Sequence, residues 1–144
     1  MENYRQLRER QQQEFNALPI KFAFNKQQFA EGMAALGLAP EDEDKIYTLG
    51  SGSFYRRSDA ELIAGTMKRH DRELAEAFAA DATGEGFIYS AMLYELDNHE
   101  YGYTGDPEDA LAALGYTLEE VAGDARLYAG FKKAKKEIYS REDY

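Results

Sequence analysis

The stretch EGFIYSAMLYELDNHEYGYTGDPED, residues 85–109, governs the interpretation of the whole chain. Placing its residues at 100° steps around a helix gives two apolar arcs. One arc holds Ile88, Tyr89, Met92, Leu93 and Leu96, and the other holds Phe87, Ala91 and Tyr94. A helix that is apolar on two sides is normally packed on two sides. The sequence therefore predicts a central helix over about residues 86–100.

The second half of this stretch, residues 97–109, is acidic and rich in tyrosine. Asp106 is placed to cap a new helix, with Pro107 at its first position, and we expect residues 101–105 to form a loop. Because helix starts favour negative charge, part of the acidity has a structural explanation. We predict that this segment is an exposed rim and that it binds a partner. The predicted contact residues are Asp97, Glu100, Tyr101, Tyr103, Asp106, Glu108 and Asp109.

Working outward, the chain predicts an α+β fold: a mostly α-helical single domain over residues 1–144. Helix-capping pairs recur along it, at Asn3 with Gln6, Asn25 with Gln28, Ser58 with Glu61, and Thr117 with Glu120. We expect five to six helices around the central helix. Strand-forming residues at 20–24, 45–49 and 53–57 predict a small two- to three-stranded antiparallel sheet. The glycine turn at residues 50–52 favours a hairpin between the last two strands.

Composition limits the classes of function. The 144 residues contain no cysteine, so disulfides, thiolate nucleophiles and cysteine-bound zinc are excluded. No apolar run is long enough to cross a membrane, and the N-terminus has no apolar signal segment. We therefore expect a cytoplasmic protein with no membrane partner. No motif predicts a cofactor or a metal site.

The net charge of −10 is unevenly distributed. Residues 1–70 contain ten acids and ten bases, residues 71–120 contain thirteen acids and one base, and residues 121–144 contain four acids and six bases. Such a field repels phosphates and attracts basic surfaces. We therefore expect no direct nucleic-acid binding, and we expect a protein partner with a basic surface. Solubility is the simpler explanation of the same charge.

Three polar residues form a candidate pocket. Glu95 and His99 are four residues apart, so both can project from the same side of a helix. With His70 they offer groups suited to a small-ligand pocket or to hydrolytic chemistry. The structural interpretation is stronger for each histidine: His70 lies on the apolar stripe of its helix, and His99 ends the central helix. No metal-ligand signature is matched.

Three runs of sequence resemble a family of small acidic proteins of bacteriophages and other mobile elements. They are FNALPIKFAFNKQQFAEGMAALGL, DKIYTLGSGSFYRRSD and YELDNHEYGYTGDPEDALAALG. The resemblance implies no catalytic residues. It implies that the protein binds and blocks a host defence protein, as small accessory proteins of such elements often do.

These observations lead to one leading hypothesis and two alternatives. The leading hypothesis is a non-enzymatic inhibitor of a host defence factor of anti-CRISPR type. Its acidic surface would occupy the basic site where a nucleic-acid-dependent nuclease binds its nucleic acid. One alternative is a small-molecule-binding or hydrolytic enzyme with its pocket around Glu95 and His99. The other is a structural or assembly protein, for example a homodimer joined through an amphipathic helix.

Overall fold

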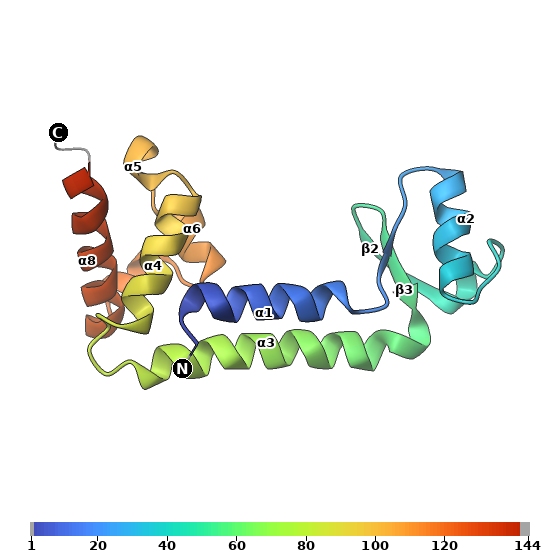
Figure 1. The fold of residues 1–144 in the computed structure, drawn as a ribbon, viewed down its shortest axis with the longest axis horizontal. Coiled ribbons are helices and arrows are strands. Elements are labelled where there is room, and N and C mark those ends of the chain that lie inside the picture. The colour runs from blue at the N-terminus through green and yellow to red at the C-terminus, as the bar shows by residue number, and fades with distance from the viewer. Residues whose placement is uncertain (1, 142–144) are drawn as a thin grey trace. The chain divides into compact units, whose positions relative to one another are not determined.

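The computed structural model describes residues 2–141, and it divides into two compact units. The helical unit comprises Met1–Arg10 and Arg72–Tyr144, and the sheet unit comprises Gln11–Asp71. The division passes through two helices, α1 (Tyr4–Asn16) and α3 (Ala60–Ala80). The α+β class is confirmed, with a mostly helical chain and one small antiparallel sheet (Figure 1). That the chain forms a single domain stays a prediction.

The sheet unit contains three antiparallel strands in the order β1-β3-β2. They are β1 (Lys21–Phe22), β2 (Ile46–Gly50) and β3 (Ser53–Arg56), and β2 and β3 form the predicted hairpin. Helix α2 (Lys26–Ala35) begins at Asn25, whose side chain accepts a hydrogen bond from the Gln28 backbone N–H as predicted. A core of Met33, Leu36, Ile46 and Phe54 lies between α2 and the sheet.

The predicted cap of α3 is wrong. Ser58 lies within a short 3₁₀ turn, Arg57–Asp59, and α3 begins at Ala60. The Ala60 backbone N–H already bonds the Arg57 carbonyl, so the 3₁₀ turn runs directly into the helix. A helix that continues from a turn in this way has no need of a side-chain cap at Ser58.

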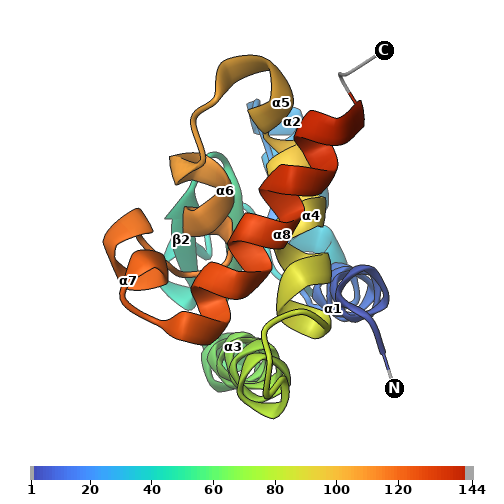
Figure 2. The same ribbon diagram turned by 90° about the vertical axis from the view of Figure 1, so that its left-hand side faces the viewer.

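The helical unit contains α4 (Phe87–Asn98), α5 (Tyr101–Thr104), α6 (Glu108–Ala113), α7 (Leu118–Ala122) and α8 (Ala125–Arg141). Helix α4 packs against α8 and α6, and α8 runs alongside it (Figure 2). Its fully buried residues come from both predicted arcs, and they are Ile88, Ala91, Met92 and Leu96. This two-sided burial confirms that α4 is central to its unit.

The number of helices exceeds the prediction. Residues 2–141 form eight α-helices where five or six were expected, although the predicted caps at Asp106 and Thr117 already marked the starts of α6 and α7. The predicted loop at residues 101–105 contains the one-turn helix α5. In the described part of the chain, no helix is both long enough and apolar enough to span a membrane.

Candidate interaction surface

The start of α4 is held by one carboxylate, Asp81. Its oxygens accept hydrogen bonds from the backbone N–H groups of Gly84, Gly86 and Ile88 at 3.0–3.1 Å. Burial acts to raise the pKa of Asp81, but the bonds from these N–H groups outweigh it and lower the pKa below its usual value. Asp81 therefore fixes the turn that places α4.

At the other end of α4 the rim forms a groove of about 540 Å³. Three predicted contact residues line it: Asp97, Glu100 and Tyr103. The Tyr103 side chain is 92% exposed, so almost none of its ring is packed within the protein. Arg141 also lines the groove, and its guanidinium bonds both oxygens of Asp97 at 3.1 Å. The groove therefore combines an Asp97–Arg141 ion pair, the Glu100 carboxylate and the exposed ring of Tyr103.

Glu100 has an unusual backbone conformation. Its φ of 56° and ψ of 37° lie in the left-handed region, between the end of α4 and the start of α5. For a residue with a Cβ atom this conformation costs about 1–2 kcal/mol relative to the right-handed one. Glycine is the usual residue at such a position. Glu100 thus places an exposed carboxylate at the groove. Glycine at this backbone position would make the fold more stable.

Tyr101 does not contribute to this surface. It was predicted to be exposed, but its side chain is only 4% exposed. Because residues 101–104 form a helical turn instead of a loop, the ring points into the core against Phe131 and Tyr139. The Tyr139 hydroxyl donates to the Tyr101 hydroxyl at 3.1 Å, and burial is the main reason that the pKa of Tyr101 is raised.

The remaining rim acids lie at the start of α6. Asp106, Glu108 and Asp109 are all exposed. The Asp106 carboxylate accepts a bond from the Glu108 backbone N–H at 3.0 Å, and Glu108 and Asp109 occupy the first turn. The cap residue of α6 is Pro107, which was predicted to lie within the helix. The helix therefore begins one position later than predicted. These acids stabilise a helix start and remain accessible to a partner.

The structure gives Glu95 and His99 internal partners. The Glu95 side chain is 7% exposed and accepts a hydrogen bond from the Tyr4 hydroxyl at 3.1 Å. The Nδ1 atom of His99 lies 2.8 Å from the backbone carbonyl oxygen of Glu95, which can only accept, so Nδ1 carries the hydrogen. These contacts engage one oxygen of Glu95 and one nitrogen of His99 within the protein.

His70 belongs to the sheet unit, whereas Glu95 and His99 belong to the helical unit. It is buried, as predicted for a residue on the apolar stripe of α3. Its backbone carbonyl accepts a bond from Gln11, and its Nε2 atom lies 3.5 Å from a Glu14 carboxylate oxygen. His70 thus joins α3 to α1 within the sheet unit.

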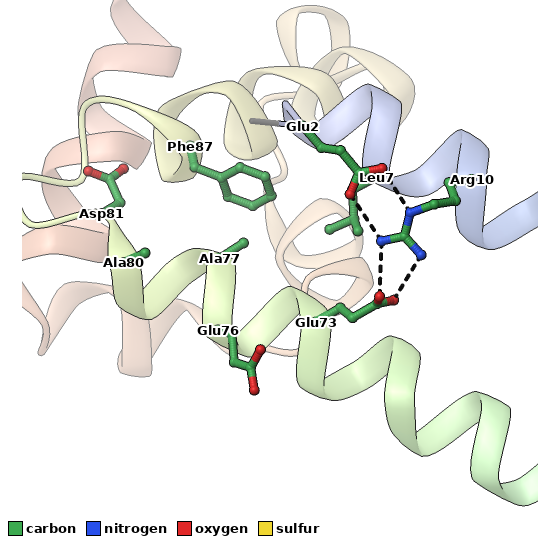
Figure 3. A pocket seen from close by; sticks show the side chains of 9 residues that line it. All are labelled: Glu2, Leu7, Arg10, Glu73, Glu76, Ala77, Ala80, Asp81 and Phe87. Atoms are coloured by element: carbon green, nitrogen blue, oxygen red, sulfur yellow. Dashed lines mark hydrogen bonds and ion pairs between the residues drawn. The ribbon is translucent and has the colours of Figure 1, made fainter.

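The helical unit also contains a pocket that the sequence did not indicate (Figure 3). It has a volume of about 520 Å³ and an apolar floor of Leu7, Ala77, Ala80 and Phe87. Four carboxylates and one guanidinium line its edge: Glu2, Glu73, Glu76, Asp81 and Arg10. Arg10 bonds both Glu2 and Glu73 at 2.8–3.3 Å, joining the N-terminal segment to α3.

This pocket suits a cation that carries an apolar stem, such as a lysine or arginine side chain. One guanidinium cannot neutralise four carboxylates, so the edge keeps a negative charge, while the floor offers apolar contact to the stem. Sequence reasoning missed the pocket because Glu73 lies 63 residues from Arg10 along the chain. Only the alignment of α1 with α3 within this unit brings them together.

Comparisons with known proteins identify a family and no characterised relative. Searches of curated proteins and of solved structures found no significant match. The pattern of one family, described as a family of unknown function (DUF7659), matches residues 3–137. This match covers α1 to α7 and most of α8. The chain therefore belongs to the family of unknown function DUF7659.

Proposed function

We propose that this protein is a non-enzymatic binding protein whose acidic helical unit occupies a basic, nucleic-acid-binding surface of another protein. The observation that carries the proposal is the nearly complete exposure of Tyr103 beside the carboxylates of Asp97 and Glu100. The resemblance to proteins of phages and mobile elements favours a host defence factor as the target. A nucleic-acid-dependent nuclease of CRISPR type has the required basic surface.

Charge supports this kind of partner. Residues 71–120, all in the helical unit apart from Asp71, contain thirteen acids and only one base. Such a surface imitates the charge of a nucleic acid and accelerates encounter with a basic groove. Salt screens this attraction: at 0.1 M ionic strength, charges more than about 10 Å apart hardly act on each other. The proposed complex is therefore salt-sensitive.

Tyr103 offers the binding energy of a buried aromatic ring, which exposed charges do not supply. Exposed charges give fast and selective association, whereas most binding energy in an interface comes from a few buried residues, often tyrosine, tryptophan or arginine. A tyrosine that its own protein leaves 92% exposed can bury its whole ring in a partner. We therefore assign Tyr103 as the anchor, with Asp97, Glu100, Asp106, Glu108 and Asp109 around it.

The strained backbone of Glu100 also favours a binding role. Strained residues persist where the surroundings impose them, and they concentrate at functional sites. The pocket in Figure 3 adds a second place for a basic side chain of the same partner. Both features lie in the helical unit.

The test is a pull-down from host lysate at low and at high salt, followed by competition with labelled nucleic acid for the captured nuclease. Tyr103→Ala should weaken binding about 30-fold, as expected for a lost anchor worth about 2 kcal/mol. Tyr128→Ala, at a half-exposed tyrosine of α8, is the control and should bind normally. Glu100→Gly should weaken binding while it stabilises the fold, which separates the two effects.

A second pair of variants tests the charge. The neutral variant Asp106→Asn/Glu108→Gln/Asp109→Asn should bind more weakly and should lose much of the salt dependence. The control removes three exposed acids of the sheet unit, Glu41→Gln/Glu43→Gln/Asp44→Asn. Equal effects of the two triple variants would show that only net charge matters. Full binding by Tyr103→Ala would remove the proposed anchor.

A further inference from the structure

Two alanines of α3 create the space of the pocket in Figure 3. Ala77 follows Glu73 by four residues and Ala80 follows Ala77 by three, so these positions share one face of the helix. Because a methyl group fills little space, this face leaves a pocket of about 520 Å³. Pockets that bind small ligands commonly have volumes of this order. The pocket is therefore large enough for an organic ligand.

Two larger side chains, Leu7 and Phe87, complete the apolar part of the pocket. Leu7 is only 4% exposed. The Phe87 ring packs edge-on against Tyr4 and Phe78, with ring centroids 6.0 and 5.8 Å apart. Neighbours in the core thus hold both side chains in place. A ligand with an apolar stem meets a surface that is already ordered, which lowers the entropy cost of binding.

Negative charge lies at both ends of this apolar surface. Figure 3 shows Asp81 at one end and Glu2, Arg10 and Glu73 at the other, with the alanines and the Phe87 ring between them. Glu73 and Asp81 are eight positions apart, which corresponds to a helical rise of about 12 Å. Arg10 bonds both Glu2 and Glu73, and two carboxylates with one guanidinium leave that end negative.

The other two carboxylates of the pocket also keep their charge. Glu76 lies three residues after Glu73, is exposed, and has no ion pair with any group in residues 2–141. The hydrogen bonds that the Asp81 side chain accepts come from backbone N–H groups, which are uncharged. These contacts therefore neutralise neither carboxylate, and the pocket favours a ligand with more than one positive charge.

We propose that this pocket binds a free linear polyamine, with ammonium groups at its two ends and its methylene chain along the apolar residues. Spermidine has nine bonds between its end nitrogens. An extended chain advances about 3.5 Å for every three bonds, so spermidine spans about 10 Å and matches the separation of the charged ends. A basic side chain of a partner brings one charge and engages only one end. Polyamine binding needs no partner protein, and it does not depend on the function proposed for Tyr103 and the acidic rim.

Filling the pocket tests this proposal. Isothermal titration calorimetry of the purified protein with spermidine should show saturable binding at one site. Ala77→Leu fills the pocket without changing any charge and should weaken binding at least about tenfold. Leucine favours a helix nearly as well as alanine does, so this variant should keep its fold. Ala75→Leu is the matched control, since Ala75 is exposed on α3 and does not line the pocket. It should bind spermidine normally.

The charge requirement is tested separately. Glu76→Gln removes one carboxylate from the edge of the pocket and should weaken spermidine binding about threefold. Glu119→Gln removes an exposed acid of α7 that does not line the pocket, and it should have no effect. An equal concentration of Mg²⁺ should not displace spermidine, because a strongly hydrated ion gains nothing from the apolar residues.

Four results would overturn the proposal. They are the absence of saturable binding, full displacement of spermidine by Mg²⁺, equal affinities of the two leucine variants, and equal affinities of the two glutamine variants. The peptide Gly-Lys-Gly distinguishes the other source of a cation. If it binds more tightly than spermidine, the pocket belongs to a partner's side chain and the polyamine proposal is wrong.

Discussion

At the scale of single residues, the contact between Tyr4 and Glu95 has the clearest energetic consequence. A buried carboxylate is costly unless it is hydrogen-bonded. Glu95 meets this requirement through the Tyr4 hydroxyl, which in turn accepts a bond from Arg8 at 2.9 Å. Burial is the largest cause that raises the pKa of Tyr4, to about 12, with Arg8 opposing it and Glu95 adding to it. Glu95 therefore serves the stability of the helical unit.

The expected result of Tyr4→Phe follows from these contacts. Glu95 loses its donor, so the free energy of unfolding at neutral pH should fall by about 1–3 kcal/mol. A folded-state pKa above the unfolded value of 10.0 means that the contribution of Tyr4 is complete below pH 10 and is lost as pH rises toward 12. Urea unfolding at pH 7, 10 and 11 should show a shallower alkaline decline in the variant.

The control for this prediction is Tyr128→Phe, at a half-exposed position of α8. It should leave both the neutral stability and the alkaline decline unchanged. Part of the decline will persist in Tyr4→Phe, because burial also raises the pKa of Tyr101. Identical pH profiles for the natural chain and Tyr4→Phe would refute the assigned role of Tyr4.

At the scale of elements, the contact between α4 and α8 depends on one glycine. A Cβ atom on Gly130 would lie 2.6 Å from the Gly84 carbonyl oxygen and 2.7 Å from Cγ2 of Ile88. Both neighbours are themselves held in place, one in the backbone turn capped by Asp81 and the other in the core. The two helices can therefore approach this closely only while residue 130 has no side chain.

Gly130→Ala should destabilise the protein by about 1–3 kcal/mol, as overpacked cores do. Gly65→Ala is the matched helical control, because nothing lies within 4 Å of a Cβ atom there. That change should stabilise α3 by up to about 1 kcal/mol, since alanine favours the helix more than glycine does. Thermal unfolding of both variants checks the prediction, and shifts of the same sign would contradict it.

At the scale of the whole molecule, the two units differ in the size of their cores. Fifteen buried residues form the core of the helical unit, against four in the sheet unit. Local unfolding is easier where fewer apolar groups are buried. Stability is therefore unevenly distributed, and the sheet unit is the easier of the two to unfold locally.

Hydrogen exchange should reveal this difference. Backbone amides of α4 and α8 should exchange more slowly than those of α2 and β3. Met33→Ala and Met92→Ala each remove a fully buried side chain and should each cost about 2–5 kcal/mol. The first should accelerate exchange mainly in α2 and β3, and the second in α4 and α8. Equal protection of the two units in the natural chain would contradict this account.

The sequence by itself determined most of the local structure. The pairs Asn3–Gln6 and Thr117–Glu120 form capping boxes as predicted, and the glycine turn joins β2 to β3. These features depend on contacts between residues a few positions apart, so a short window of sequence contains all the information that they need. The two apolar arcs of α4 likewise predicted its central position, because helical periodicity is also a local property.

Only the tertiary structure decided which polar groups are accessible. Tyr101 and Tyr103 are two residues apart in the same acidic segment, yet one is buried against α8 and the other is almost fully exposed. The roles of Glu95 and Arg10 likewise depend on Tyr4 and Glu73, which lie 91 and 63 residues away along the chain. Burial depends on how distant elements pack, because a side chain is removed from water by neighbours that the surrounding sequence does not contain.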